Sequence, residues 1–195
     1  MPIKTSFNKF IRWLGYDLGI TPNQITVGRL FFFVPGWLMW FYRQELGAYS
    51  GVPWQVFGWA ALVLITTVIT LDVVDGALAR ETGQVSEKGK ILDPAVDKLI
   101  TYSTLALFWV AITKIGFVTL FVLDVVSTLL RKTKVKGANR FGKNKALCQN
   151  ISKFFFGTAV LLSIDHLNII GNVLIWAAVI LATISVGIRI LPDKQ

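Results

Sequence analysis

The sequence predicts an all-α integral membrane protein with six transmembrane helices and an N-terminal amphipathic interfacial helix. Hydrophobic residues make up 54% of the 195 residues, and the mean hydropathy of +0.60 lies above that of an ordinary soluble domain. Apolar runs of roughly the 20 residues that a bilayer requires recur along the chain. Lysine and arginine are divided unevenly between the connections of these runs, as in a multi-pass membrane protein.

The first predicted element is an amphipathic juxtamembrane helix within residues 1–20, ahead of a membrane domain over residues 21–195. Phe7, Phe10, Ile11 and Leu14 recur at positions i, i+3, i+4 and i+7, so they form one apolar face, and the basic residues lie elsewhere around the helix. This pattern is typical of a helix that lies on the cytoplasmic leaflet. The alternative is that the same face packs on the protein itself.

Six spans are predicted to follow in chain order. They lie near residues 25–42, 54–79, 91–113, 115–130, 146–164 and 168–188. The fourth run is short for a span. An even number of spans places both termini on the same side of the membrane.

The basic residues predict which side this is. Only Arg43 and Lys114 fall in connections on one side, and Arg29, Lys98 and Lys153 fall within spans. The rest of the 20 lysines and arginines lie on the other side, with the termini. Because cytoplasmic loops collect positive charge, the sequence predicts a multi-pass protein whose termini face the cytoplasm.

Four aspartates interrupt the second and third apolar runs. Asp72 and Asp75 are three residues apart and Asp93 and Asp97 are four apart, so each pair lies on one face of its helix. A short turn at Gly83–Lys88 would bring the two pairs face to face at the cytoplasmic side. Four desolvated carboxylates would repel one another there, so the arrangement predicts a bound cation.

Carboxylate oxygens without a nearby histidine or cysteine favour Mg²⁺ or Mn²⁺, and four of them are suited to two ions. Two-metal sites clamp phosphate oxygens and stabilise displacement at phosphorus. Gly76 and Gly89 would let a bulky ligand approach the backbone closely. Arg80, on the same face as the first pair, could hold a phosphate.

These residues carry a resemblance. The pattern DxxDGxxAR, followed after eight residues by GxxxDxxxD, resembles the signature of the CDP-alcohol phosphatidyltransferase family in every fixed residue and spacing. Its eight fixed positions are Asp72, Asp75, Gly76, Ala79, Arg80, Gly89, Asp93 and Asp97. The six predicted spans and the cytoplasmic position of the motif are similar to that family as well. The upstream stretch TPNQITVGRL resembles the family's entry to the first span.

The resemblance implies a role for each matched position. It implies that Asp72, Asp75, Asp93 and Asp97 are metal ligands and that Asp97 is also the general base. It further implies that CDP-diacylglycerol is the donor, that CMP is released, and that the protein is a homodimer in the lipid bilayer with its active site at the cytoplasmic face. No nucleic acid partner is expected. The residues implied to contact the CDP group are Asn23, Thr26, Gly76, Ala79, Arg80, Ser86 and Gly89. For Asn23, a simple helix N-cap is the alternative.

The acceptor is predicted from the basic segment 131–150. Its charge favours a phosphorylated alcohol, and GKNKALCQ resembles the GKxKTxxQ stretch of phosphatidylglycerophosphate synthases, whose acceptor is glycerol 3-phosphate. Ala146 replaces the threonine, and Val122–Asp124 stands where those enzymes have Ala-Arg-Glu, so inositol phosphate, inositol and serine stay open. Ordinary positive-inside charge is the alternative explanation of the segment. The predicted acceptor-phosphate residues are Lys143, Lys145, Arg131 and Arg189.

Two other classes of protein are compatible with part of the pattern. A membrane prenyltransferase also binds a metal diphosphate through aspartates, and a cation transporter also carries intramembrane aspartates. Neither explains the Gly-x₂-Ala-Arg continuation. Asp124, in the middle of the fourth run, is expected to pair with a basic residue or with a hydroxyl such as that of Ser127.

Overall fold

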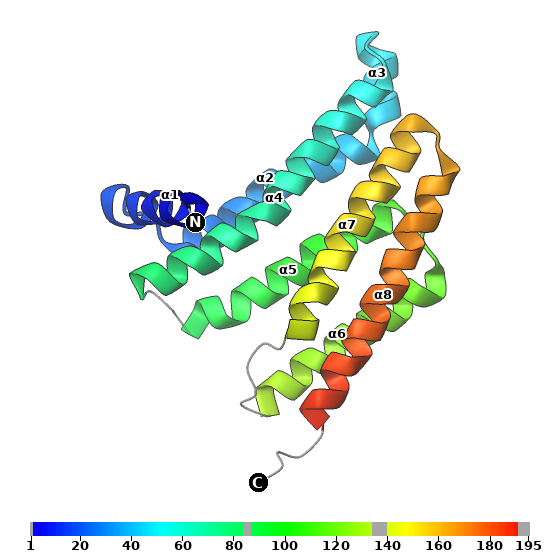
Figure 1. Ribbon diagram of the computed structural model, residues 1–195. Coiled ribbons are helices and arrows are strands. Elements are labelled where there is room, and N and C mark those ends of the chain that lie inside the picture. Colours follow the sequence, from blue (N-terminus) through cyan, green and yellow to red (C-terminus); the bar gives the residue numbers. More distant parts are fainter. Residues whose placement is uncertain (1, 84–86, 134–139, 191–195) are drawn as a thin grey trace. The chain divides into compact units, whose positions relative to one another are not determined.

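A computed structural model describes residues 2–83, 87–133 and 140–190, with the side chains of 7–83, 94–130 and 140–190. Every secondary-structure element in this part of the chain is a helix, so the all-α prediction is confirmed (Figure 1). The chain divides into two compact units, residues 1–100 and residues 101–195. We describe each unit by itself.

The first unit is built around two long antiparallel helices, α2 (Pro22–Phe41) and α4 (Trp54–Thr82). A capping box begins α2: the Thr21 hydroxyl accepts a hydrogen bond from the Gln24 backbone N–H, and the Gln24 side chain accepts one from the Thr21 backbone N–H. Pro22 occupies the first turn, where its missing N–H costs no hydrogen bond. Glycine in the left-handed region, Gly83, ends α4.

The chain forms a short helix, α3 (Arg43–Ser50), after α2 and before α4. This helix was not predicted from the sequence. It departs from α2 with a bend of 71°. Apolar side chains of α2 and α4, among them Phe33, Ile65 and Val68, are buried between the two helices. Gly36 allows this approach, because a Cβ atom there would lie only 3.2 Å from Leu64 Cδ2.

The amphipathic segment packs on the end of α4. It forms α1 (Pro2–Arg12) and a π-helical turn, η1 (Trp13–Asp17), and Ile11 is buried. Arg12 Nε lies 2.5 Å from Glu81 Oε1, and this hydrogen bond raises the pKa of Arg12 above its ordinary value. A Cβ atom at Gly15 would lie 2.6 Å from Thr82 Cγ2. The alternative prediction, packing on the protein, is therefore confirmed for part of the apolar face.

The second unit contains α6 (Lys114–Thr133), α7 (Arg140–Leu162) and α8 (Asp165–Ile190), and the C-terminal end of α5 (Glu87–Leu107). α8 packs on both α6 and α7 (Figure 1). Its small residues Gly171, Ala178 and Ala182 are buried, and the core of this unit also contains the buried side chains of Phe156 and Leu120. Gly171 in particular lies directly against the Phe156 ring.

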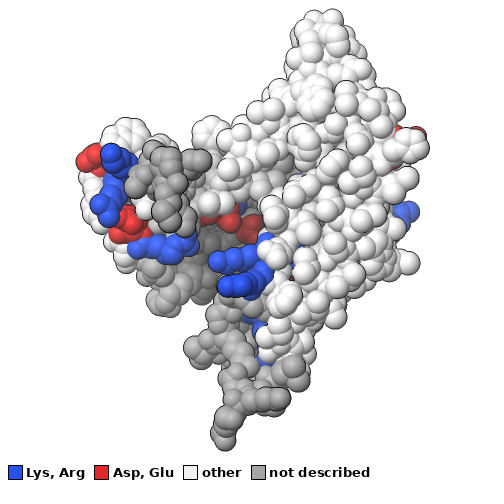
Figure 2. Space-filling view, viewed as in Figure 1, with Lys and Arg blue, Asp and Glu red and all other residues white. Residues whose placement is uncertain are grey.

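The apolar helices indicate a membrane protein. Within the described residues, two helices are long and apolar enough to cross a bilayer, Trp54–Thr82 and His166–Ile190, and a third candidate arises if α2 and α3 form one bent span. Large apolar side chains such as Phe31 and Ile115 point outward, and the long helices show mostly uncharged side chains on the face in Figure 2. The count of six spans stays a prediction.

Candidate active site

The candidate active site of the first unit is centred on Asp72 and Asp75, which α4 presents on one face. The facing side of α2 supplies Arg29, and its Nη1 lies 2.6 Å from Asp72 Oδ1 and 3.1 Å from Asp75 Oδ2. The Arg29 Nε donates a further hydrogen bond of 3.2 Å to the Val68 carbonyl oxygen. One guanidinium group thus joins the two predicted metal ligands.

Burial differs sharply between the two carboxylates. The Asp75 side chain is 5% exposed and that of Arg29 is 1% exposed, whereas the Asp72 side chain is 46% exposed. Buried charges need partners, and Arg29 is a buried cation shared by both carboxylates. Of the two carboxylates, Asp72 is the one that is open to solvent.

Thr26 adds a second contact from α2. Its buried hydroxyl lies 3.3 Å from Asp75 Oδ2 and 3.2 Å from the Pro22 carbonyl oxygen, so its one proton has two acceptors to choose from. Asn23, in the preceding turn, is partly buried. The structure thus places Thr26 beside a predicted metal ligand, and the contact of Thr26 and Asn23 with a nucleotide stays a prediction.

Gly76 and Arg80 follow the carboxylates along α4. A Cβ atom at Gly76 would meet only Arg80 Nη1, at 3.6 Å, and Arg80 itself is exposed. Ala79 lies between them and is partly buried. Open space beside a guanidinium and a glycine backbone suits a phosphate group, which fits the predicted roles of these residues.

The second predicted carboxylate pair lies on α5. Asp97 is exposed, whereas Gly89 and Asp93 belong to the first turns of α5, whose side chains the structure does not describe, and Ser86 lies outside the described residues. Among the side chains that are described, no group of three or more His, Cys, Asp or Glu residues could hold a metal ion. The convergence of the four aspartates is therefore untested and stays a prediction.

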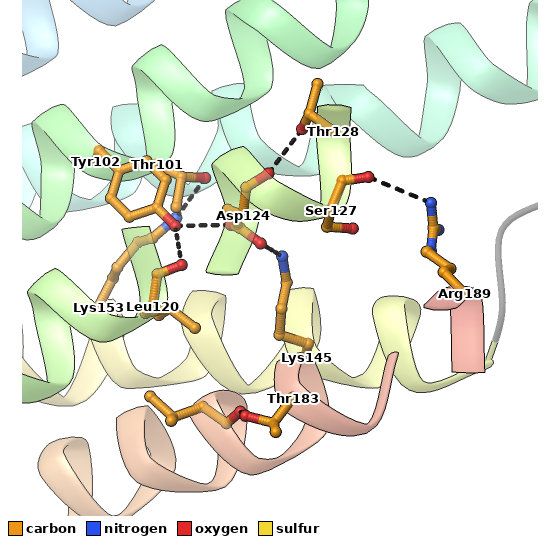
Figure 3. Close-up of polar contacts among 11 residues, drawn as sticks. Thr101, Tyr102, Leu120, Asp124, Ser127, Thr128, Lys145, Lys153, Thr183 and Arg189 are labelled. Carbon is orange, nitrogen blue, oxygen red and sulfur yellow. Dashed lines mark hydrogen bonds and ion pairs between the residues drawn. The ribbon is translucent and has the colours of Figure 1, made fainter. Parts of the chain in front are cut away.

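The second unit carries a separate polar cluster around Asp124 (Figure 3). The Tyr102 hydroxyl donates a 2.6 Å hydrogen bond to Asp124 Oδ2, and Lys145 Nζ forms an ion pair with Asp124 Oδ1. The prediction that Asp124 pairs with a basic residue is confirmed. Its side-chain hydroxyl partner is Tyr102, whereas Ser127 offers its backbone carbonyl oxygen to Arg189 Nη1 at 3.4 Å.

The predicted acceptor-phosphate residues have different environments. Lys143 is exposed at the start of α7, and Lys145, two residues later, is partly buried against Asp124. Arg189 is 2% exposed, in the last turn of α8. The side chain of Arg131 lies outside the part that the structure describes. Only Lys143 of the described three is thus fully open to a solvent-borne anion.

Sequence reasoning missed Arg29, which was counted only as a charge within a span. A signal was present, because an arginine inside an apolar run is costly and needs an acidic partner. Arg29 follows Thr26 by three residues, so both lie on the same face of α2. The acidic residues alone suggested a metal site, and they gave no sign that Arg29 lies between Asp72 and Asp75.

The fold and this site define a class: a helical membrane protein with a carboxylate pair, a glycine and an arginine arranged on one helix at a polar site. The family model for CDP-alcohol phosphatidyltransferases matches residues 19–184, and the chain belongs to this family. The resemblance noted from the motif is therefore confirmed. Members of the family use a CDP-alcohol donor, an alcohol acceptor and divalent metal ions.

Three curated relatives show the range of the family around this chain. It is 43% identical over 84 residues to a cardiolipin synthase (CMP-forming) of Streptomyces coelicolor, covering 43% of this chain and 36% of the relative. It is 34% identical over 90 residues to an archaetidylinositol phosphate synthase of Pyrococcus horikoshii, covering 46% of this chain and 40% of the relative. A CDP-diacylglycerol–glycerol-3-phosphate 3-phosphatidyltransferase of Aquifex aeolicus is 27% identical over 135 residues, which cover 65% of this chain and 76% of the relative. The matched region thus spans well under half the length of the first two relatives.

Proposed function

We propose that the protein transfers a phosphatidyl group from CDP-diacylglycerol to a phosphorylated alcohol and releases CMP. The favoured candidate for this acceptor is glycerol 3-phosphate. The observation that carries the proposal is the single face of α4 with Asp72, Asp75, Gly76 and Arg80, in a chain of this family. Carboxylates for a metal ion, an open glycine backbone and a guanidinium are the groups that a nucleoside diphosphate requires.

The described donor set fits a divalent cation. Asp72 and Asp75 lie on one face of α4 with carboxylate oxygens close together, and half-exposed Asp72 is open to solvent. We propose that they hold Mg²⁺ or Mn²⁺, with Asp93 and Asp97 completing a site for two ions. Such ions supply charge neutralisation of the diphosphate, which makes CMP a better leaving group.

The protein's own residues would bind the donor and move the proton. Arg80 would bind a phosphate oxygen and Gly76 would let the diphosphate approach the backbone, with Ala79, Gly89, Ser86, Asn23 and Thr26 nearby. Asp97 would accept the proton of the acceptor hydroxyl. The hydroxyl oxygen would then form a bond to the phosphorus attached to diacylglycerol, as the bond from that phosphorus to the CMP oxygen breaks.

The choice of acceptor depends on the basic residues of α7. We propose that Lys143 binds the acceptor phosphate directly, since its side chain is exposed, while Asp124 holds Lys145 in place beside it. Glycerol 3-phosphate is the acceptor printed in the name of the Aquifex relative. Inositol phosphate is the second candidate, because a relative at 34% identity is an archaetidylinositol phosphate synthase. Arg131 and Arg189 would add positive charge.

The test is CMP release by the purified protein in liposomes with Mg²⁺ and CDP-diacylglycerol. Glycerol 3-phosphate, inositol phosphate, inositol and serine are supplied in turn, and release with one phosphorylated acceptor alone is expected. Asp97→Asn should lower CMP release by at least about 100-fold, because a general base contributes 10²–10⁴-fold. Asp165→Asn, in the first turn of α8, is the matched control. Full turnover of Asp97→Asn would refute the base assignment, and release with serine alone would refute the acceptor.

The family supports two further proposals about the protein's setting. We propose that the protein acts as a homodimer in the bilayer, and that its active site and termini face the cytoplasm, where CDP and a phosphorylated alcohol are available. The basic residues on one side of the predicted spans support this orientation.

A further inference from the structure

Arg29 Nη1 lies between one oxygen of Asp72 and one oxygen of Asp75, the two predicted metal ligands of α4. We propose that Arg29 is a fixed counter-cation that balances and orients Asp72 and Asp75 when no metal is bound, and that it thereby weakens metal binding at this pair. The proposal rests on the proposed function in so far as Asp72 and Asp75 are metal ligands. It makes Arg29 a positioning residue that sets the metal concentration at which the site is filled.

A hydrogen bond to the backbone of α4 also fixes the orientation of the Arg29 guanidinium. Its Nε bonds to the Val68 carbonyl oxygen, one turn of α4 before Asp72. In an α-helix this carbonyl also accepts from the Asp72 backbone N–H, and its second lone pair is the one available to Arg29. The guanidinium is thus held by the backbone of the helix that carries the carboxylates. Its Nη1 then points at both Asp72 and Asp75.

The contacts use the oxygens that a cation would need. Arg29 binds Asp72 Oδ1 and Asp75 Oδ2, and it leaves Asp72 Oδ2 without a hydrogen bond in the part of the chain that the structure describes. An ion can therefore enter at Asp72 Oδ2 from solvent, but it must share or displace the guanidinium to engage Asp75 Oδ2. A positive guanidinium next to the ion also repels it, whichever oxygen the ion uses.

The positive charge of Arg29 also reduces the repulsion between the carboxylates of Asp72 and Asp75. Asp75 and Arg29 are both almost fully buried, so loss of Arg29 would remove a buried cation that lies 3.1 Å from Asp75 Oδ2. Loss of the guanidinium should therefore destabilise the metal-free protein. It should also strengthen metal binding, because one positive charge next to the ion disappears and the vacated oxygens become available.

The experiment compares thermal unfolding of full-length variants in detergent, in EDTA and over a Mg²⁺ titration, with Mn²⁺ binding followed by electron paramagnetic resonance. For Arg29→Gln we expect a lower Tm than wild type in EDTA, a larger rise in Tm with Mg²⁺, and Mn²⁺ binding tighter by about tenfold or more. Arg29→Lys keeps the charge, so its Mn²⁺ affinity should stay within about threefold of wild type.

Arg43→Gln is the matched control. Arg43 lies at the far end of the same helix pair, where Nη1 donates to the Trp40 carbonyl oxygen at 2.7 Å and the guanidinium stacks over the Trp40 ring. Its loss should lower Tm equally with and without Mg²⁺. The same uniform loss in Arg29→Gln, with unchanged Mn²⁺ affinity, would make Arg29 a packing residue and overturn the proposal.

Two further outcomes are distinguishable. If Arg29→Gln does not fold under either condition, the double variant Arg29→Gln/Asp75→Asn provides the test. It should fold without metal, because it also removes the buried carboxylate charge that pairs with Arg29. Its failure to fold would overturn the proposal. If wild type binds no Mn²⁺ and is unaffected by Mg²⁺, the metal assignment fails and the role of Arg29 with it. Absence of CMP release with intact Mn²⁺ binding would overturn the proposed reaction but leave the role of Arg29 standing.

Discussion

Asp124 joins two side chains of neighbouring helices in the second unit (Figure 3). It lies in the middle of α6, where a lone carboxylate would be costly, and it accepts from Tyr102 and pairs with Lys145. Both partners are largely buried, and each of them contacts one of the two carboxylate oxygens. Asp124 thus connects α5, α6 and α7 and holds Lys145 in one place.

Substitutions of Asp124 should distinguish the contribution of its ion pair with Lys145 from that of its hydrogen bond with Tyr102. Asp124→Asn keeps an acceptor for Tyr102 but leaves Lys145 without its charge partner, and we expect a loss of about 2–4 kcal/mol in the free energy of unfolding. Asp124→Ala should cost more, since it also removes the 2.6 Å acceptor of the Tyr102 hydroxyl and leaves the longer contact of 3.1 Å to the Leu120 carbonyl oxygen. Reversible unfolding in detergent measures both. In the double variant Asp124→Asn/Lys145→Met the losses should be less than additive, and full additivity would contradict the pairing.

Lys143 provides the control at the same scale. Its side chain is exposed, so Lys143→Met should change the free energy of unfolding by no more than about 0.5 kcal/mol. If it binds the acceptor phosphate, the same variant should raise the KM for the phosphorylated acceptor and leave that for CDP-diacylglycerol unchanged. An unchanged acceptor KM would remove Lys143 from the binding site.

At the scale of helices, glycines set how closely α7 and α8 approach. A Cβ atom at Gly171 of α8 would lie 2.6–2.9 Å from three atoms of the Phe156 ring of α7, and both residues are buried. A ring surrounded by core side chains cannot shift freely, so helix and ring would have to separate. Gly187, on the same helix, has open space around it.

Gly171→Ala should therefore destabilise the second unit by about 1–3 kcal/mol, although alanine favours a helix over glycine. Gly187→Ala meets no neighbour, and the helix preference alone should stabilise it by up to about 1 kcal/mol. Thermal unfolding of the two variants side by side provides the measurement. Equal shifts for both would show that the Phe156 contact does not limit the packing.

Most of the helices could be predicted from the apolar runs of the sequence, but their ends and one short helix could not. Each of the six predicted apolar runs overlaps a helix, because a run inside a membrane has to satisfy its backbone hydrogen bonds internally. The third run was predicted over residues 91–113, whereas α5 ends at Leu107 and turns follow it, so the end of that run is wrong. The short helix α3 was missed, since RQELGAYS is polar and carries no apolar period. The N-terminal ends of α5 and α7 extend several residues beyond the runs into charged segments, where hydropathy gives no signal but the backbone hydrogen bonds continue.

The same limit applies to the site. Spacing along one helix predicted that Asp72, Asp75, Gly76 and Arg80 share a face, because helical geometry is local. The partner of Asp75 comes from another helix, and one sequence contains no record of which residue of α2 faces it. The contacts between helices were therefore needed to identify Arg29 as the partner of Asp75. They were also needed to identify Tyr102 and Lys145 as partners of Asp124, for which the sequence predicted only a basic residue or a hydroxyl.

At the scale of the whole molecule, charged residues lower the hydropathy of several helices, and within the described residues two or three helices qualify as spans by length and composition. α5, α6 and α7 each contain charged residues within an otherwise apolar run, among them Asp97, Asp124 and Lys153. Polar contacts described above offset the charge of Asp124, and Lys153 Nζ donates to Thr101 and Asn150 side chains. A helix whose charges are satisfied inside the protein can cross a bilayer although its composition alone does not indicate it.

Six crossings make a definite prediction for cysteine labelling. On a Cys148→Ser background, single cysteines are placed at Lys9, Lys114, Lys143 and His166, and a membrane-impermeant maleimide is applied to intact spheroplasts or to inside-out vesicles. Positions 9 and 143 should react only from the cytoplasmic face and positions 114 and 166 only from the outer face, because α6 separates 114 from 143 and α7 separates 143 from 166. Reaction of positions 114 and 143 from the same face would show that α6 does not cross, and the six-span prediction would be wrong.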